Sequence, residues 1–315
     1  MERVAVFNPA VRTLEESVSR AKAAERLGFE SVWTTQMPDA RDAALVLAAY
    51  AYNTQRVKLG TGVLPIYTRH PTAMAQMAAS LDELSGGRFI LGIGISHKVT
   101  VEGMWGLRLE NPVEAMREYL TIVRTTLREG GSSFDGRYFT ARSVYSGPRR
   151  ADLPIMISAL NPRMLDLAGE LADGIVLYMC TPAYVRDHVV PAVRSGREKV
   201  GKTLDGFEIV AAVPVSLTTD RAAAHDVFRK TVARYAALPY YRKMMDASGL
   251  GSELEEERVG ERVLDELSGI GDAERVREGI ARYRDAGVTL VGAGPFGGHD
   301  GAAGFEGTLE AIAGA

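Results

Sequence analysis

Polar side chains that could do chemistry follow directly on several short apolar runs of this sequence. They are Asn8, Gln36, Ser96 with His97, Ser158 with Asn161, and the sulfur-bearing pair Met179 and Cys180. His97 is the strongest candidate for proton transfer, because imidazole titrates near neutral pH. The set holds no pair of carboxylates, and the sequence has no G-x-S-x-G or H-E-x-x-H motif, so hydrolysis by such a triad or by a zinc ion has no support. This set suits an organic cofactor that supplies its own chemistry.

The apolar runs have the length of β-strands and lack the polar alternation of a half-exposed strand. A strand that is covered on both faces has this character, as in a parallel sheet. Between the runs lie amphipathic segments that begin at polar caps or first-turn prolines, such as Thr13 with Glu16, Asn161-Pro162 and Thr181-Pro182. We therefore predict strands at residues 3–9, 31–35, 57–63, 89–95, 154–159, 174–179, 207–217 and 289–294.

Eight strands joined by helices predict an α/β protein with a (β/α)8 TIM barrel. The competing architecture is a doubly wound sheet, which would carry a glycine-rich dinucleotide-binding loop. Residues 292–297 match G-x-G-x-x-G, but the roughly 20 residues that follow are too few for the βαβ unit that this motif requires. In a barrel, ligands and catalytic groups gather at the carboxyl ends of the strands, where the polar set falls.

Two stretches interrupt the alternation of strand and helix. Residues 97–111 and a β-like excursion at residues 133–146 follow the fourth strand, and residues 239–271 follow the helix after the seventh. We interpret residues 239–271 as an insertion and a candidate lid. The whole chain, residues 1–315, is expected to form a single domain, as α/β barrels of this size do.

The composition of the chain argues against several kinds of binding partner and metal site. The chain has 315 residues, a formal net charge of −3 and one cysteine. A single cysteine excludes an intramolecular disulfide and a cysteine-cluster metal site, and we expect no bound metal. Interspersed charges argue against nucleic-acid and membrane partners. Because the sequence shows no leader pattern and no long apolar run, we expect a cytoplasmic protein with a small-molecule substrate.

Four glycines, Gly60, Gly62, Gly92 and Gly94, lie near the ends of the predicted third and fourth strands. A backbone without Cβ atoms allows close approach of another group. We interpret these glycines as room for a flat ligand.

Long motifs occur in three parts of the sequence: GTGV…YTRHP…LDELSGGRFILGIG, PIMISALNPRMLDLAGELADG and AGVTLVGAGPFG. They resemble the bacterial luciferase-like superfamily, and within it the coenzyme F420-dependent branch typified by methylenetetrahydromethanopterin reductase. The resemblance extends from Arg3 to about Gly298. It implies a barrel that binds coenzyme F420, or alternatively FMN, at its carboxyl-terminal rim, usually in a homodimer.

The resemblance also implies individual contacts. In relatives the third strand ends in a bulge that backs the cofactor ring, often with a cis peptide bond, which here would be Gly62–Val63. The loops after the fourth and fifth strands match segments that hold the ribityl chain and phosphate. The predicted cofactor contacts are Asn8, Thr35, Gly62, Val63, Gly94, Ser96, Lys98, Ser158, Ala159, Leu160, Asn161, Arg163, Met179 and Cys180, and the predicted substrate contacts are Met104, Trp105 and Phe296.

The chain departs from the family pattern in two loops. Where relatives often have Thr-Asp-His after the second strand, this chain has Thr35-Gln36-Met37, and Ile95-Ser96-His97 replaces the usual Pro-Gly-Asp after the fourth. The resemblance also places the reductase's first-strand carboxylate at Val6, so the proton donor that the reductase would use is missing. We therefore predict His97 as the catalytic proton donor or acceptor, with Gln36 acting through a bound water as the second candidate.

Three functions remain open on the sequence. The first is an F420-dependent oxidoreductase that transfers a hydride to or from an electrophilic C=C or C=N bond of a small organic substrate. The second is an FMN-dependent monooxygenase that uses the same pocket. The third is a non-catalytic ligand-binding member of the fold, which the scarcity of acid and base residues would fit. We favour the first, because the motifs match that branch best.

Overall fold

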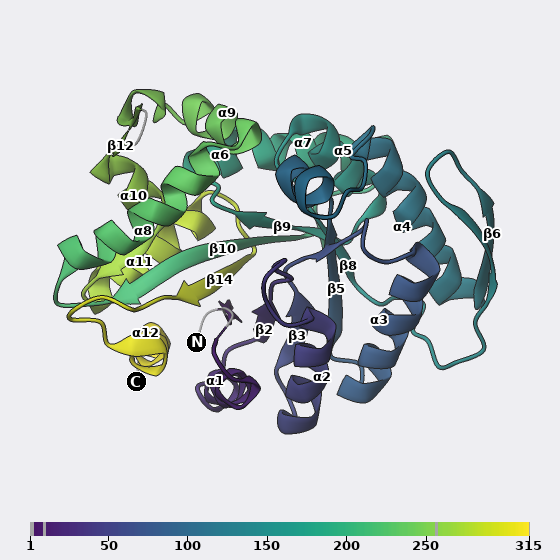
Figure 1. Ribbon diagram of the computed structural model, residues 1–315, viewed down its shortest axis with the longest axis horizontal. Coiled ribbons are helices and arrows are strands. Elements are labelled where there is room, and N and C mark those ends of the chain that lie inside the picture. The colour runs from purple at the N-terminus through teal and green to yellow at the C-terminus, as the bar shows by residue number, and fades with distance from the viewer. Residues whose placement is uncertain (1–2, 9–10, 256–257, 315) are drawn as a thin grey trace.

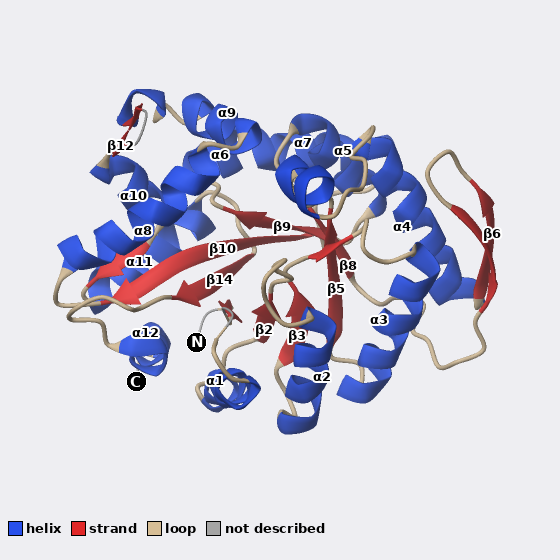
Figure 2. Ribbon diagram, viewed as in Figure 1, coloured by secondary structure: helices blue, strands red, loops and turns tan. Residues whose placement is uncertain are grey.

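The computed structural model describes residues 3–8, 11–255 and 258–314. Parallel strands close into a barrel with helices around it (Figures 1 and 2). The last and first strands close the ring, with Val291 opposite Val4. The (β/α)8 barrel predicted from the sequence is thus confirmed, although Pro9, the predicted end of the first strand, lies outside the described residues. The barrel strands are β1 (Val4–Phe7), β2 (Ser31–Thr34), β3 (Lys58–Thr61), β5 (Phe89–Gly94), β8 (Ile155–Ser158), β9 (Gly174–Tyr178), β10 (Glu208–Leu217) and β14 (Leu290–Pro295).

The helices of the outer layer begin where the sequence places caps. Thr13 accepts a hydrogen bond from the Glu16 N–H group, and Asn161 accepts one from Met164, which satisfies backbone donors that a helix leaves free at its start. His70 caps in the same way. The outer helices are α1 (Leu14–Arg26), α2 (Ala43–Asn53), α3 (Pro71–Ser85), α4 (Pro112–Glu129), α5 (Pro162–Leu171), α6 (Pro182–Tyr184), α7 (Val190–Lys199), α8 (Arg221–Ala236), α11 (Ala273–Asp285) and α12 (Gly304–Ala313).

The predicted interruptions contain secondary structure of their own. After β5 comes a π-helix, η1 (Val99–Met104), and after α4 an antiparallel hairpin of β6 (Gly131–Asp135) and β7 (Thr140–Val144), which projects beyond the helix layer in Figure 1. A second π-helix, η2 (Val185–Val189), joins α6 to α7, and β4 (Leu64–Pro65) pairs with β5. Residues 239–271 contain α9 (Pro239–Ala247), η3 (Gly251–Glu253), β11 (Leu254–Glu255), β12 (Arg258–Val259), α10 (Glu261–Leu267) and β13 (Gly269–Gly271). Because β13 pairs with β10, the end of this segment belongs to the main sheet.

The barrel interior is filled by side chains from alternate strand positions. The stacked rings of Phe7 and Trp33, with centroids 5.7 Å apart, form its centre. Smaller residues such as Ala5, Val210 and Leu290 complete this inner core. A second, larger core lies between the strands and the helices. Because the interior is packed, a ligand can bind only above it, at the carboxyl ends of the strands.

The glycines near the strand ends serve this packing. A Cβ atom would lie 2.4 Å from the Trp33 ring at Gly60, 2.5 Å from the Phe7 ring at Gly62, 1.9 Å from the Thr61 carbonyl oxygen at Gly92 and 2.3 Å from Ser158 Oγ at Gly94. Protein atoms therefore fill the space that the missing Cβ atoms leave. Our interpretation as room for a flat ligand was wrong for Gly60, Gly92 and Gly94, whereas Gly62 lines the cavity described below and its contact with a ligand stays a prediction.

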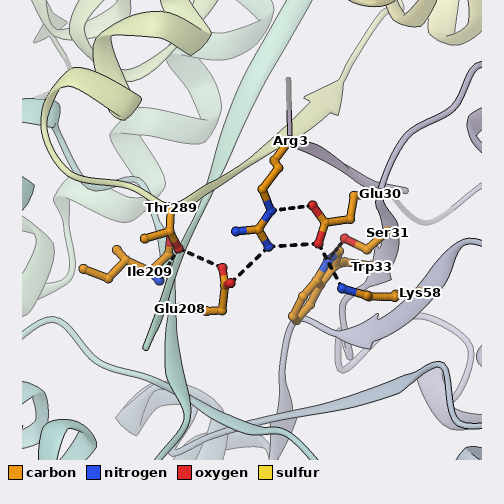
Figure 3. A network of polar contacts seen from close by, with 8 residues as sticks. All are labelled: Arg3, Glu30, Ser31, Trp33, Lys58, Glu208, Ile209 and Thr289. Carbon is orange, nitrogen blue, oxygen red and sulfur yellow. Dashed lines mark hydrogen bonds and ion pairs between the residues drawn. The ribbon is translucent and has the colours of Figure 1, made fainter. Parts of the chain in front are cut away.

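The opposite end of the barrel is closed by an ionic network (Figure 3). Arg3 lies between two carboxylates, with its Nε 2.7 Å from Glu30 and its Nη2 3.0 Å from Glu208. Lys58 Nζ lies 3.1 Å from Glu30, and Thr289 donates to Glu208. These residues stand at the amino ends of β1, β2, β3, β10 and β14, so the network ties together strands that are distant in sequence. The network lies at the amino-terminal end of the barrel, whose residues serve stability and not catalysis.

We expect Glu30→Gln to lower the free energy of unfolding by about 1 kcal/mol at pH 7. The hydrogen bond from Arg3, aided by Lys58, lowers the pKa of Glu30 below its ordinary value. A carboxyl with a lower pKa in the folded state contributes stability that is complete above its unfolded pKa and is lost as the pH falls through the folded value. Urea unfolding should thus show a difference between variant and wild type that shrinks in acid. Asp135→Asn, in the exposed ion pair with Arg142, is the control and should change little; a Glu30 effect independent of pH would contradict the explanation.

Candidate active site

A cavity of about 510 Å³ opens at the carboxyl ends of the strands. All the barrel strands, or the loops directly after them, contribute residues to its wall, and Phe7, Val176 and Ala212 connect it to the inner core below. Its volume lies in the range of sites that bind small molecules and cofactors. Most of its lining is apolar, with a few polar side chains between.

The cavity brings together most of the residues that the sequence singled out. Those that line it share a position at the carboxyl end of a strand or in the loop directly after it, and they are Asn8, Thr35, Gln36, Gly62, Val63, Ser96, His97, Ser158, Ala159, Leu160, Asn161 and Phe296. Their contacts with a cofactor or substrate stay predictions, but their shared location is what those contacts require.

Seven predicted contacts lie outside the cavity lining: Gly94, Lys98, Met104, Trp105, Arg163, Met179 and Cys180. After His97 the chain enters η1, which leaves Lys98 75% exposed and 3.6 Å from Glu102, and Met104 66% exposed. Arg163 is also exposed, in the first turn of α5. Met179 and Cys180 are buried instead, and burial raises the pKa of the Cys180 thiol, so it is a poor nucleophile. Roles for these seven residues stay predictions.

Asn8 presents a fixed hydrogen-bond acceptor to the cavity. Its Nδ2 donates to the Ser17 carbonyl oxygen at 2.9 Å and to Tyr50 Oη at 2.6 Å. Its Oδ1 is buried and has no donor among the residues that the structure describes. A buried acceptor without a partner costs free energy, and a ligand N–H group would satisfy it.

Gln36 is less free than a catalytic role through water would need. Its Oε1 accepts a hydrogen bond from the Ala43 N–H group at 2.9 Å, and its Nε2 donates to the Met37 carbonyl oxygen at 3.3 Å. Both ends of the amide are therefore engaged with backbone. The side chain helps to fix the start of α2 at the cavity wall.

The cis peptide bond that the family resemblance implies at the end of the third strand is present. The peptide bond between Gly62 and Val63 is cis, as predicted, and it separates β3 from β4. Thr35 Oγ1 donates to the Gly62 carbonyl oxygen at 2.9 Å. Both residues of this bond line the cavity, so the backbone here forms part of its wall.

His97 lies in an aromatic cluster that the sequence analysis missed. Its ring meets those of Tyr235 and Tyr241 edge-on, with centroids 6.0 and 5.9 Å away, and Tyr178 packs against Tyr235 at 5.1 Å. Burial lowers the pKa of His97 below its ordinary value. The imidazole is therefore neutral at pH 7 and able to accept a proton. The available signals were the Tyr240-Tyr241 pair at the start of residues 239–271 and the position of Tyr235 on α8.

The sequence analysis also passed over a P-loop spacing at residues 196–203, GREKVGKT. A P-loop links a strand to a helix and holds phosphate with its backbone. Here Gly196 lies inside α7, and a Cβ atom on it would be 2.0 Å from the Asp166 carbonyl oxygen. This glycine permits close packing of α7 on α5, and the motif is not a phosphate site.

Two classes of feature are absent from the described part of the chain. Within residues 3–8, 11–255 and 258–314, no group of three or more His, Cys, Asp or Glu side chains is placed to hold a metal ion. Over the same residues, no helix has both the length and the apolar character to cross a membrane.

Comparison with known proteins identifies the family. The family model described as luciferase-like monooxygenase matches residues 3–290. A Mycobacterium tuberculosis protein named as a coenzyme F420-dependent oxidoreductase is 33% identical over 312 residues, covering 85% of this chain and 87% of its own. The 5,10-methylenetetrahydromethanopterin reductase of Archaeoglobus fulgidus is 35% identical, over 67% of this chain and 63% of its own. The solved F420-dependent tetrahydromethanopterin reductase of Methanopyrus kandleri superposes with a TM-score of 0.81 at 25% identity, over 99% of this chain and 98% of its own. The chain belongs to the luciferase-like monooxygenase family.

Proposed function

We propose that this protein is a coenzyme F420-dependent oxidoreductase. In this proposal it transfers a hydride between the deazaflavin and an electrophilic C=C or C=N bond of a small organic substrate. The observation that carries the proposal is the cavity at the barrel rim, walled by the Gly62–Val63 backbone, in a chain similar over most of its length to proteins named for F420.

The residues present fit such a cofactor. The unpaired Oδ1 of Asn8 would accept a hydrogen bond from a ring N–H group. Ser158 and Asn161 lie at the cavity wall directly before α5, whose amino end offers free backbone N–H groups to a phosphate. When bound, the deazaflavin supplies or accepts the hydride and does not react readily with oxygen.

The chain's own residues would position the substrate and move the proton. The neutral imidazole of His97 would take the proton released when the substrate is oxidised, and return it in the reverse direction. Tyr235 and Tyr241 pack against this ring, and Tyr178 extends the aromatic surface by packing against Tyr235; this surface would exclude water from the place of transfer. Phe296 also lines the cavity, where it stacks on Phe228.

Binding of the two candidate cofactors tests the proposal. Purified protein is titrated with F420 and with FMN, following fluorescence, and oxygen uptake is then measured with reduced FMN. Binding of F420 without oxygen consumption supports the proposal. Tight binding of FMN with oxygen consumption and no binding of F420 would establish the monooxygenase instead, and binding of neither would favour the non-catalytic alternative.

We further propose that residues 239–271 cover the bound substrate. Tyr240 and Tyr241, at the start of α9, line the cavity. If the segment acts as a lid, amide hydrogen exchange in α9 should slow when F420 and substrate bind; an unchanged exchange rate would contradict the proposed lid.

The expected location of the protein is the cytoplasm, and a green fluorescent fusion found outside it would contradict this.

A homodimer is proposed from the character of α2. Every residue of this helix except Asn53 is hydrophobic, yet Leu45 is 72% and Tyr52 76% exposed. A helix that is apolar all round is normally buried on all sides, and a second copy of the chain would bury this face in a symmetric contact.

We expect the wild-type protein to sediment at about twice its 34.0 kDa chain mass at micromolar concentration. Leu45→Glu combined with Tyr52→Glu should convert it to a monomer, because buried charges would oppose association. Val144→Glu, at a residue 88% exposed on the β7 hairpin strand, is the matched control and should leave the dimer intact. A monomeric wild type would remove the proposal.

A further inference from the structure

Arg234 differs from the other residues that line the cavity. Within the described part of the chain, it is the one side chain of the lining with a permanent charge. It lies on α8, on the stripe formed by Val227, Phe228, Thr231, Arg234 and Tyr235, all of which line the cavity. These positions fall on one face of a helix, so the backbone of α8 directs Arg234 toward the cavity.

The guanidinium of Arg234 has no carboxylate partner among the residues that the structure describes. Other arginines of α8 do have one: Arg221 pairs with Asp265, and Arg229 Nε lies 3.8 Å from Asp226. Arg234 instead lies over the ring of Tyr235, with 5.8 Å from Cζ to the ring centroid. This contact holds the side chain beside the aromatic cluster, while its hydrogen-bond donors stay available.

Among the residues that the structure describes, no Asp or Glu lines the cavity, so no described carboxylate compensates the charge of the exposed Arg234 there. A ligand that brings an anionic group would supply the missing partner, and a guanidinium binds the two oxygens of a carboxylate with parallel hydrogen bonds. A monoanion matches the single positive charge, whereas a phosphate dianion would remain half-neutralised. The single charge of the wall thus fits a carboxylate.

Arg234 lies close to the proposed proton-transfer residue, so an anion bound to it would lie close to that residue too. Arg234 contacts Tyr235, and Tyr235 contacts His97, the proposed site of proton transfer. Asn161 and the amino end of α5, proposed above to hold the cofactor phosphate, follow β8, whereas α8 follows β10. The two ionic sites therefore belong to different parts of the barrel wall.

We propose that Arg234 binds a carboxylate of the substrate, so that the enzyme acts on small unsaturated or imino acids. This inference rests on the proposed function, since it names the substrate class of the same site. Arg234 becomes a specificity-determining residue, and the bond that reacts lies between the bound carboxylate and His97.

Benzoate and benzamide test the proposal, because they share one shape and differ in charge. Their binding is measured on the protein loaded with F420, through the fluorescence of the bound deazaflavin, and by calorimetry on the cofactor-free protein. Wild type should bind benzoate about tenfold more tightly than benzamide, as expected for one charge-assisted pair near the surface. Arg234→Gln should abolish this preference and leave the affinity for benzamide and for F420 unchanged. Arg229→Gln, on the same helix but outside the cavity lining, should keep the preference.

The outcomes separate the possible sources of the anion. Equal binding of benzoate and benzamide by wild type would overturn the proposal, as would a preference that survives in Arg234→Gln. An Arg234→Gln variant with weakened F420 binding would also overturn it, by assigning the arginine to the acidic part of the cofactor. If neither F420 nor FMN binds, the proposed function fails, and calorimetry on the cofactor-free protein still decides whether Arg234 selects a carboxylate.

Discussion

Replacing Gly92 with alanine is expected to lower the free energy of unfolding by about 3 kcal/mol or more, near the upper end for overpacking of a protein core. A Cβ atom at this position would lie 1.9 Å from the carbonyl oxygen of Thr61. That oxygen belongs to the backbone of β3, so no side-chain rotation can relieve the clash. The Thr61 hydroxyl also binds Gly92 twice, donating to its carbonyl oxygen at 2.8 Å and accepting from its N–H group at 2.7 Å.

Urea unfolding of the Gly92→Ala variant measures this loss. Gly103→Ala is the matched control. A Cβ atom there would have no atom within 4 Å apart from those of its chain neighbours and of the backbone of its own helix, and its effect should stay within about 0.5 kcal/mol. Separation of β3 from β5 would also displace the Gly62–Val63 wall, so F420 binding should fall together with stability. A Gly92→Ala protein with the wild-type unfolding midpoint would contradict the close approach of the two strands.

Much of the fold could be predicted because its signals are local. A strand without polar alternation, a cap such as Asn161, and a stop such as Gly86, with φ of 68°, can each be recognised in a few consecutive residues. Eight repetitions of this pattern leave few architectures other than a barrel. The rule that strand ends carry the site, together with the family resemblance, then predicted residues most of which line the cavity.

The features that could not be predicted from the sequence depend on contacts between residues that are distant in the chain. The atoms that crowd Gly92 come from another strand, so the glycine was interpreted as room for a ligand. Lys98 and Met104 point away from the cavity because the chain enters a π-helix after His97, a rare form with no reliable local signal. Arg234 and Tyr235 sit in a helix whose cavity-facing side is defined only by the fold.

The environment of His97 constrains how it can act. Its pKa is lowered by burial, and no carboxylate of a described residue lies in the cavity lining to hold a proton on the ring. The imidazolium form is therefore scarce at pH 7. A base of this kind works best when the substrate is oxidised, because it accepts the proton that leaves as the hydride is transferred.

Replacing His97 with alanine should lower turnover about 100-fold or more, the usual contribution of a positioned proton-transfer group. In the oxidation direction, kcat/KM of the wild type should be constant above the pKa of His97 and fall as the pH drops through it, at a value below the ordinary 6.5. The variant should lack this acidic limb, while its affinity for F420 stays within about threefold of wild type. His97→Phe keeps an aromatic ring against Tyr235 and Tyr241 and should lose turnover equally, which separates proton transfer from packing. Unchanged turnover in His97→Ala would contradict this role. The substrate itself would then have to carry the proton, since both ends of the Gln36 amide are already engaged with backbone.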